Sequence, residues 1–501
     1  EGSEEQLGKV GEATNYMKLK KALVNKRYAP TYHAVSPVGW VNDPNGLSYF
    51  NGNYNLYFQY NPYDTVWGPM HWGHYTTKDF IKWELENVAL APDMPYDNEF
   101  GIFSGSAIEY DGLLYAMYTG VANGLQQQCI ATSKDGINFE KLTRNPVISE
   151  KQIPNDYSKI DFRDPYIFVS NDYYHVLIGT KNKNNKGTLL LYKSKDLKSW
   201  NFVGEVLNTN KQNEKNYCSV DGVFECPSYA EIGGKEILIC SPQFLAQEGI
   251  KHQNIHSVVY MIGQFDYQTG KFNYEEMNDL DSGFDFYAAQ TLKTPDGRTI
   301  MIAWMQMWDR NMPTQQDGWA GGFTLPRELS IKDNHLYQAP VREIEKYRID
   351  KVTYQNQTIL SNKPLALANI SGKSIELELT LNVGNSKKAG VKLFKGTNNE
   401  TLLYYDSVNE EVVIDRSNSG QVITGKETNN KTRRAKAKLI NGTIKLRIFL
   451  DVSTIEVFIN DGYSTLSTNV YPDLNDDRIE FYSENGNAVL NEVTKYTIKT
   501  L

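Results

Sequence analysis

The order of hydrophobic and polar positions divides the 501 residues into three parts. Residues 1–27 contain no proline, and from Ala13 onward they predict a short charged helix. Over 28–346, short aromatic and β-branched runs alternate with Asn/Asp/Gly turns, which predicts many short strands. Over 352–501, segments such as 374–381 and 444–459 alternate apolar and polar residues with period two. We therefore expect an N-terminal helical extension (1–27), a strand-rich domain (28–346) and a β-sandwich (352–501), in which Gly425–Arg434 is an exposed loop.

A repeat runs through the strand-rich part. The pattern Ser/Thr-Lys-Asp-x-x-x-Trp/Phe begins at Thr77, Ser133 and Ser194, which are 56 and 61 residues apart. A second ladder of polar residues has steps of 60 to 62 residues and consists of Asp43, Ser104, Asp164, Glu225 and Tyr287. Each unit has room for four short strands, the size of a blade in a radially repeated sheet. The sequence therefore predicts an all-β fold with a five-bladed β-propeller, whose ladder residues converge on one central funnel.

Composition narrows the class of protein. The chain exceeds the roughly 250–300 residues of a single core, in agreement with two domains. Its 60 acidic and 52 basic residues give a net charge of −8, which offers no basic field for nucleic acid. The apolar runs are too short to span a bilayer, and four cysteines without a C-x-x-C pair make neither a disulfide framework nor a zinc ribbon. The 33 tyrosines suit strands and sugar-binding clefts alike.

Three ladder residues are acids, and each is followed within two positions by proline: Asp43, Asp164 and Glu225. An isolated Asp-Pro is usually a turn cap, but three acids at equivalent blade ends would crowd one cavity. Their mutual repulsion and burial would separate their pKa values, so that one carboxyl is protonated while another is ionised. Such a pair is the machinery of glycoside hydrolysis.

The acids lie in motifs that resemble those of glycoside hydrolase family 32, the β-fructofuranosidases, which include invertase, fructanase and sucrose-6-phosphate hydrolase. The motifs are Trp40–Gly46, Phe58–Pro62, Trp67–His74, Phe103–Ser106, Phe162–Pro165, Glu225–Pro227, Asp285–Gln290 and Gly318–Gly321 leading to Pro326–Leu329. The resemblance extends from Tyr28 through the second domain. It implies a five-bladed propeller followed by a C-terminal β-sandwich, the same architecture that the repeat predicts.

By resemblance, Asp43 is the nucleophile, Glu225 the general acid/base, and Asp164 binds fructose hydroxyls and stabilises the transition state. The implied reaction is attack of Asp43 on the anomeric C2 of a terminal fructose while Glu225 protonates the departing oxygen. Water then releases fructose with retention, and the two carboxyls of such an enzyme lie about 5–5.5 Å apart. Arg163, beside Asp164 in the sequence, is expected to keep that carboxylate ionised.

Other positions resemble the family's fructose subsite: Asn42, Gln59, Ser104 and Arg163 as polar contacts, Trp67, Phe103 and Trp304 as an apolar wall, and Asp285 and Tyr287 on the side of the fifth blade. For Phe103 and Trp304, packing within the blades is an equally good interpretation. Val41 and Ile102 differ from the residues more usual in the family. These two differences leave the three acids in place but leave the leaving-group preference open.

The predicted function is a retaining, exo-acting β-fructofuranosidase that releases terminal non-reducing β-D-fructose from sucrose and short fructo-oligosaccharides by double displacement. An exo-inulinase or levanase, a sucrose-6-phosphate hydrolase or a fructosyltransferase would use the same three acids. A phosphorylated substrate would need a cationic partner, which the sequence does not single out, although Asn15–His33 resembles that intracellular branch. A non-catalytic fructan-binding protein is expected to lack an acid, whereas all three are present.

The expected partner is a small-molecule carbohydrate, with no nucleic acid, no membrane and no cofactor. No metal site is expected, because His71 and His74 lie in a loop-like family motif and His252 and His256 lack a third ligand. A homodimer remains open, since the sandwich of one copy could wall the funnel of another. A start without Met and five N-x-Ser/Thr sequons favour secretion, whereas the N-terminal helix favours the cytoplasm. The sequons are at Asn356, Asn369, Asn399, Asn430 and Asn441.

Overall fold

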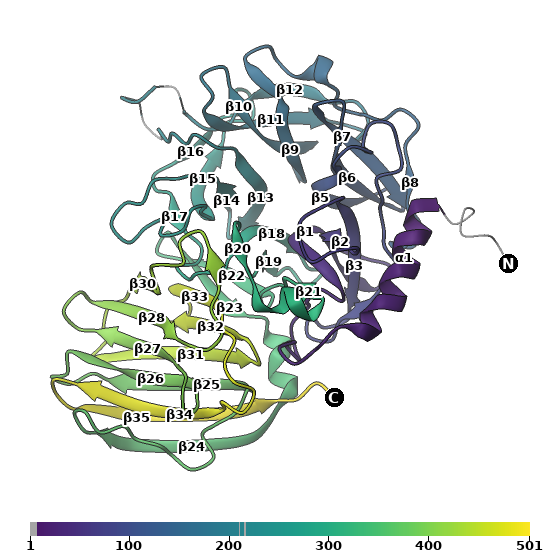
Figure 1. Cartoon of the computed structure of the whole chain (residues 1–501). Coiled ribbons are helices and arrows are strands. Elements are labelled where there is room, and N and C mark those ends of the chain that lie inside the picture. The colour runs from purple at the N-terminus through teal and green to yellow at the C-terminus, as the bar shows by residue number, and fades with distance from the viewer. Residues whose placement is uncertain (1–7, 210, 215–216) are drawn as a thin grey trace.

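The structure, a computed structural model, describes residues 8–209, 211–214 and 217–501. Figure 1 shows a β-propeller above a β-sandwich, with helix α1 (Gly8–Lys20) along the outer side of the propeller. The predicted fold class is confirmed. The helix begins at Gly8 rather than Ala13 and is followed by the 3₁₀ turn η2 (Lys21–Leu23), while residues 1–7 of the extension lie outside the described residues. Over the described ranges, no helix combines the length and apolar character needed to cross a bilayer.

The described residues form five blade sheets. Blade 1 contains β1 (Gly39–Phe50), β2 (Asn53–Asn61), β3 (His71–Thr77), β4 (Glu84–Leu85) and β21 (Trp319–Ala320). Blade 2 contains β5 (Gly101–Tyr110), β6 (Leu113–Ala122), β7 (Leu125–Ser133) and β8 (Glu140–Lys141). Blade 3 contains β9 (Tyr157–Ser170), β10 (Tyr173–Asn182), β11 (Gly187–Ser194) and β12 (Asn201–Glu205). Blade 4 contains β13 (Phe224–Ile232), β14 (Lys235–Pro242), β15 (Val259–Phe265), β16 (Phe272–Tyr274) and β17 (Asn278–Asp279). Blade 5 contains β18 (Tyr287–Lys293), β19 (Thr299–Trp304), β22 (Arg327–Lys332) and β23 (His335–Pro340).

The ring of blades is closed by a strand that comes late in the sequence. β21 lies between β19 and β22 in chain order, but it pairs in parallel with β1 of blade 1. A late segment of the propeller sequence is therefore joined to its first strand in one sheet. Short 3₁₀ helices complete the connections: η3 (Glu150–Gln152), η4 (Pro313–Asp317) and η5 (Arg342–Tyr347).

The Ser/Thr-Lys-Asp repeat forms the turn between the third and fourth strands of blades 1, 2 and 3. In each copy the hydroxyl of Thr77, Ser133 or Ser194 accepts a hydrogen bond of 2.8–2.9 Å from the amide three residues later. The repeat aspartate accepts from the amides two and three residues beyond itself, at 2.8–3.0 Å. These side chains satisfy the turn's free backbone donors, which explains why the pattern recurs once per blade.

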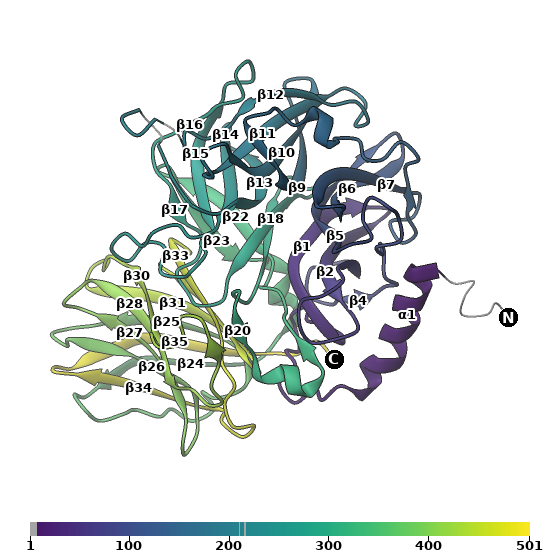
Figure 2. The ribbon, with the colours of Figure 1, turned by 45° about the horizontal axis from the view of Figure 1, so that its top comes forward.

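The ladder residues occupy equivalent places in the five innermost strands. β1, β5, β9, β13 and β18 contact one another in a closed ring, and Figure 2 shows them around a common centre. In each of these strands a bulge interrupts pairing with the second strand at the ladder residue. A bulge redirects the local side chain. This shared irregularity aims five side chains at one end of the central funnel.

The sandwich consists of two antiparallel sheets. The six-stranded sheet has the order β24 (Arg348–Ile359), β35 (Ala488–Ile498), β25 (Ser374–Asn382), β31 (Thr443–Asp451), β32 (Thr454–Ile459) and β33 (Ser464–Asn469). The other has the order β30 (Thr432–Lys436), β28 (Glu411–Asn418), β27 (Glu400–Asp406), β26 (Lys388–Lys395) and β34 (Arg478–Glu484). On β25, Ile375, Leu377 and Leu379 point into the core between the sheets, as their period-two spacing predicts.

Buried ion pairs hold the sandwich against the propeller. His33, ahead of the first blade, lies between Asp451 at 2.7 Å and Glu456 at 2.6 Å, and Arg327 of blade 5 also bonds Glu456. The segment Gly425–Arg434 is not the freely exposed loop that its composition indicates. Its first residue belongs to β29 (Thr424–Gly425), which pairs with β20 (Arg310–Asn311) of the propeller.

Candidate active site

The three predicted acids meet at one end of the funnel. Asp43 lies on β1, Asp164 on β9 and Glu225 on β13, each at a bulge. The backbone of Asp164 and of Cys226 adopts positive φ, 69° and 47°, which turns both side chains out of the regular strand direction. The Cys226 sulfur lies 3.2 Å from Oδ2 of Asp43 and 3.6 Å from Oδ2 of Asp164. Carboxyls from two blades therefore face each other across a single sulfur atom.

Asp43 is a buried carboxyl with defined donors. The Ser104 hydroxyl donates to its Oδ2 at 2.5 Å, and the Asn42 amide donates to its Oδ1 at 3.3 Å. Burial, followed by the charge of Glu225, raises the pKa of Asp43 to about 6, while hydrogen bonds from Ser104, Cys226 and Asn42 act in the opposite direction. The Asp43 carboxyl is therefore ionised at neutral pH but protonates well above the usual range of an aspartate.

The surroundings of Asp164 differ from the expectation. Burial, followed by the charge of Glu225, raises the pKa of Asp164 to about 8, so the neighbouring Arg163 does not hold this pKa in the usual range of an aspartate. The Arg163 guanidinium lowers this pKa less than those two effects raise it, because it bonds elsewhere, from Nε to Glu225 at 3.0 Å and from Nη1 to Asp161 at 2.9 Å. Oδ2 of Asp164 accepts instead from the Cys226 amide at 3.0 Å. Successive side chains of a strand point in different directions, so adjacency in the sequence does not bring the Arg163 guanidinium to the Asp164 carboxyl.

Glu225 is oriented from two sides and open on a third. The Tyr287 hydroxyl donates to its Oε1 at 2.7 Å and lies 3.0 Å from the carbonyl oxygen of Ser241. Arg163 fixes its other oxygen. The side chain keeps 15% of its surface exposed. The carboxyl can therefore reach a bound substrate or water while its orientation is fixed by the ladder tyrosine.

The predicted amide contacts also lie beside the acids. Asn42 accepts from the Trp40 indole at 2.9 Å, which fixes the amide that faces Asp43. Gln59 donates to the Asn45 side chain at 3.0 Å and to the Ile102 carbonyl at 2.8 Å, next to Phe103 and Ser104 on β5. Both amides are buried and held by the inner strands, so their polar atoms are oriented before a ligand arrives.

The predicted aromatic wall divides into two groups. Trp67 is 38% exposed and meets the partly buried Phe103 edge-on at 5.9 Å, so both rings lie at the rim of the funnel. Trp304 is completely buried and packs against Trp40 and Trp308 at 5.9 and 4.9 Å. Blade packing therefore describes Trp304, whereas the partly buried ring on that side belongs to Trp308.

Asp285 does not face the funnel. Its carboxylate is fully buried and bonds Arg310 at 3.2 Å and Arg416 of the sandwich at 2.9 Å. It also accepts from the Asn469 amide at 2.8 Å. The prediction of a substrate contact is wrong in geometry, because these partners from the sandwich occupy the carboxylate. Asp285 joins the two domains.

Two residues of the site escaped sequence analysis. Cys226 contacts both Asp43 and Asp164, and its position between Glu225 and a proline on the ladder is the signal that could have revealed it. Thr119 of β6 accepts from the Asp164 amide at 3.1 Å. No motif marks Thr119, because its role depends on pairing between strands.

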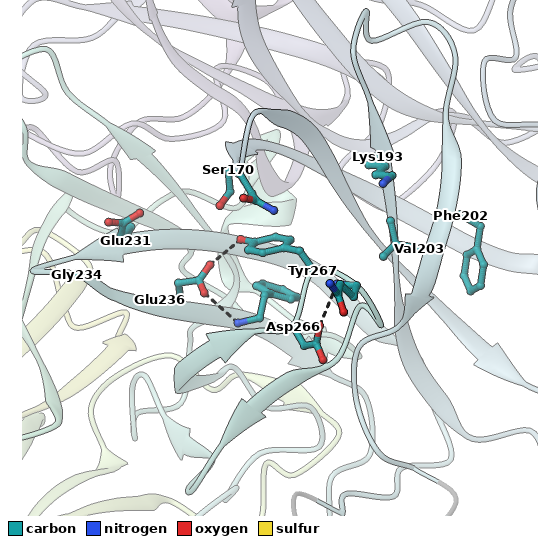
Figure 3. A pocket seen from close by; sticks show the side chains of 12 residues that line it. Ser170, Lys193, Phe202, Val203, Glu231, Gly234, Glu236, Asp266 and Tyr267 are labelled. Carbon is teal, nitrogen blue, oxygen red and sulfur yellow. Dashed lines mark hydrogen bonds between the residues drawn. The ribbon is translucent and has the colours of Figure 1, made fainter.

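A separate hollow of about 890 Å³ lies between blades 3 and 4 (Figure 3). Its Glu236 carboxylate accepts hydrogen bonds from the Tyr229 and Tyr267 hydroxyls and from the Phe265 amide, at 2.6–2.9 Å. Phe202 lines its other side. The carboxylate of Glu236 is thus committed to hydrogen bonds within blade 4.

Comparison with known proteins agrees with this site. The model "Glycosyl hydrolases family 32 N-terminal domain" matches residues 33–340, and "Glycosyl hydrolases family 32 C terminal" matches 343–499. A sucrose-6-phosphate hydrolase of Zymomonas mobilis is 35% identical over 500 residues, which cover 96% of this chain and 94% of the relative. Among solved structures, a family 32 β-fructofuranosidase of Bombyx mori has a TM-score of 0.82 and 33% identity, with 99% of each chain covered, and a mutant of that enzyme is described in complex with sucrose. The sucrose-6-phosphate hydrolase of Lactobacillus gasseri has a TM-score of 0.85 and 28% identity over 100% of this chain and 99% of that one. The chain therefore belongs to glycoside hydrolase family 32 and is a glycoside hydrolase that acts on fructosides.

Proposed function

We propose that this protein is a retaining, exo-acting β-fructofuranosidase that releases terminal β-D-fructose from sucrose and short fructo-oligosaccharides. The observation that carries the proposal is the arrangement of Asp43 and Glu225. The first is buried, hydrogen-bonded and ionised at neutral pH, and the second is partly exposed and oriented by Tyr287. A nucleophilic carboxylate and a separately positioned acid are the two groups that double displacement requires.

In the first step, an oxygen of Asp43 attacks C2 of fructose, and the bond from C2 to the leaving oxygen breaks. Glu225 transfers its proton to that oxygen, so the leaving group departs as a neutral alcohol. Ser104 and Cys226 both lie against Oδ2 of Asp43, which leaves Oδ1, with its longer contact to Asn42, as the attacking atom.

In the second step, Glu225 acts as a base and removes a proton from water, which attacks C2 and releases Asp43. Two inversions at C2 give net retention. Asp164, whose pKa is raised, can donate as well as accept a hydrogen bond to the fructose hydroxyls at pH 7. Its placement beside Cys226 brings it within reach of the same sugar ring that Asp43 attacks.

A second candidate substrate is sucrose-6-phosphate. The observation that favours it is that the relatives from Zymomonas mobilis and Lactobacillus gasseri bear the name of that activity. The complex of the Bombyx mori enzyme supports sucrose itself. Exo-fructanase and fructosyltransferase activities would use the same acids on longer donors or on a sugar acceptor in place of water.

The experiment that decides among these activities compares initial rates on sucrose, 1-kestose, inulin, levan and sucrose-6-phosphate. We expect the highest kcat/KM on sucrose or kestose, with glucose and fructose released from sucrose in equal amounts. A maximum on the polymers would establish a fructanase, and a maximum on sucrose-6-phosphate would establish the second candidate. Excess glucose over fructose would show transfer to a sugar.

A further inference from the structure

Two aromatic rings stand exposed at the rim of the funnel between blades 1 and 2. Trp67 and Phe100 are 38% and 49% exposed, and their ring centroids lie 6.5 Å apart with the planes inclined by 34°. Phe103, edge-on to Trp67, connects them to Ser104 and so to the nucleophile. Adjoining exposed apolar surface at the mouth of a polar site indicates a binding surface for a ligand with an apolar face.

The backbone under Phe100 is fixed although its ring is exposed. Its carbonyl accepts from the Met70 amide at 3.2 Å, and its own amide donates to the Val121 carbonyl at 3.4 Å. The next residue, Gly101, has a φ of 111°, and a Cβ at that position would collide with the backbone of Met70. Because the backbone that carries the ring is fixed before a ligand arrives, binding orders only the side chain of Phe100, which lowers the conformational entropy lost on binding.

The segment that carries Trp67 is fixed by hydrogen bonds from two neighbouring side chains. The Asn61 amide donates to the Val66 carbonyl at 3.0 Å, and Gln315 of η4 donates to the Thr65 carbonyl at 2.8 Å. The N-terminal helix adds a third support. Tyr16 of α1 meets Tyr63, in the same segment, edge-on at 4.8 Å. The predicted helix thus supports the rim of the funnel.

The charges beside these rings are acidic. Asp64 and Glu99 are exposed and lie close to Trp67 and Phe100 in the sequence. Two ammonium groups lie on this side: Lys141 is bonded to Asp93 at 2.6 Å and Asp97 at 2.8 Å, and Lys9 donates to the Pro92 carbonyl at 2.9 Å.

The nearby histidine adds no positive charge. The ring of His71 packs against Tyr63 at 5.8 Å, and burial lowers the pKa of His71 to about 4, so it is neutral at pH 7. A neutral sugar can stack here, whereas a phosphate dianion would meet the two exposed carboxylates, and the nearby Lys141 already has carboxylate partners.

We propose that Trp67 and Phe100 form the binding platform for the leaving group, and that this platform selects an uncharged sugar over a phosphorylated one. The inference rests on the proposed function, because it takes fructose to occupy the pocket of the three acids. Phe100 is then a specificity-determining residue that contacts the second sugar unit and leaves the reacting carbon untouched.

The test compares wild-type enzyme with Phe100→Ala on sucrose, sucrose-6-phosphate and methyl β-D-fructofuranoside, whose methyl group is too small to reach the platform. The matched control is Phe202→Ala, since Phe202 is 40% exposed in the hollow between blades 3 and 4 (Figure 3). For Phe100→Ala we expect KM for sucrose to rise about threefold to tenfold, the effect of losing one aromatic contact. We expect unchanged kinetics on the methyl fructoside, and no change on either substrate for Phe202→Ala.

The wild-type enzyme should also show a kcat/KM on sucrose at least about tenfold above that on sucrose-6-phosphate. A tenfold ratio corresponds to a difference of about 1.4 kcal/mol in activation free energy between the two substrates. Equal kinetics of Phe100→Ala and wild type on sucrose would overturn the platform, and so would an equal loss on the methyl fructoside. A preference for sucrose-6-phosphate would overturn the selectivity. These outcomes differ from failure of the proposed function, in which wild-type enzyme would hydrolyse neither sucrose nor the methyl fructoside.

Discussion

The hydrogen bond from Ser104 to Asp43 sets the acid limit of activity. The Ser104 hydroxyl donates to Oδ2 of Asp43 at 2.5 Å inside a buried site, and such a donor stabilises the carboxylate over the neutral acid. In Ser104→Ala the donor is lost while the burial that raises the pKa remains. The pKa of Asp43 should therefore rise, and the acid limb of kcat/KM should move to higher pH.

The magnitude follows from the type of bond. A hydrogen bond to a charged group contributes roughly 1.5–3 kcal/mol. Since one pKa unit corresponds to about 1.36 kcal/mol, its loss shifts the pKa by about one to two units. The Cys226 and Asn42 donors persist, so we expect the lower end, about one unit. The acid limb should move from near pH 6 in the wild type to near pH 7 in the variant.

The assay is kcat/KM for sucrose between pH 4 and 9, in constant ionic strength. The position of the acid limb is the readout, because Ser104→Ala can also lower activity at every pH through a lost contact with fructose. Ser106→Ala is the control, since Ser106 lies on the same strand and is buried, but donates to the Pro165 carbonyl at 2.8 Å. An acid limb that stays in place or moves to lower pH in correctly folded Ser104→Ala would refute the reasoning.

Three further predictions concern the buried carboxylate of Asp285, the buried His33 and the proton donor Glu225. Asp285→Asn should lower the free energy of unfolding by about 3 kcal/mol, because it leaves the buried Arg416 without its carboxylate partner and Arg310 with Glu427 at 3.4 Å; denaturant unfolding measures this, and an unchanged stability would contradict the role of Asp285 in joining the two domains. Burial lowers the pKa of His33, but its two carboxylate partners raise that pKa to about 9. The stabilisation that protonated His33 gives is therefore complete below about pH 6.5 and is lost as the pH rises toward 9. In His33→Gln the decline of Tm over that range should be flatter than in the wild type, and an equal decline in both proteins would argue against this role. Glu225→Gln should lose far more activity on sucrose than on p-nitrophenyl β-D-fructofuranoside, whose leaving group needs no proton; an equal loss on both would remove Glu225 from the acid role.

The sequence predicts the architecture well because the repeat is local. A turn motif such as Thr77-Lys78-Asp79 caps its own backbone, so its spacing reports the length of a blade directly. The ladder residue Ser104 reaches the funnel for the same reason, because equivalent strands place equivalent residues at one end. Both signals can be recognised in a single sequence, because neither depends on a contact with a residue far along the chain.

The partners of individual side chains could not be predicted in the same way. Arg163 precedes Asp164 but bonds Glu225, 62 residues away, because successive side chains of a strand point in different directions. Asp285 is paired with Arg416, 131 residues away in the other domain, and the sequence contains no local sign of this contact. Spacing specifies which backbone positions converge, whereas the direction of a side chain at a bulge depends on the folded surroundings.

The measurement that tests the central claim most directly is the configuration of the fructosyl product formed in the presence of methanol. If Asp43 forms a covalent intermediate and Glu225 activates the acceptor, methanol competes with water and yields a stable glycoside whose anomeric signal is read by NMR. The account predicts methyl β-D-fructofuranoside from sucrose, and no glycoside with Asp43→Ala. Formation of methyl α-D-fructofuranoside would contradict double displacement and the roles assigned to both carboxyls.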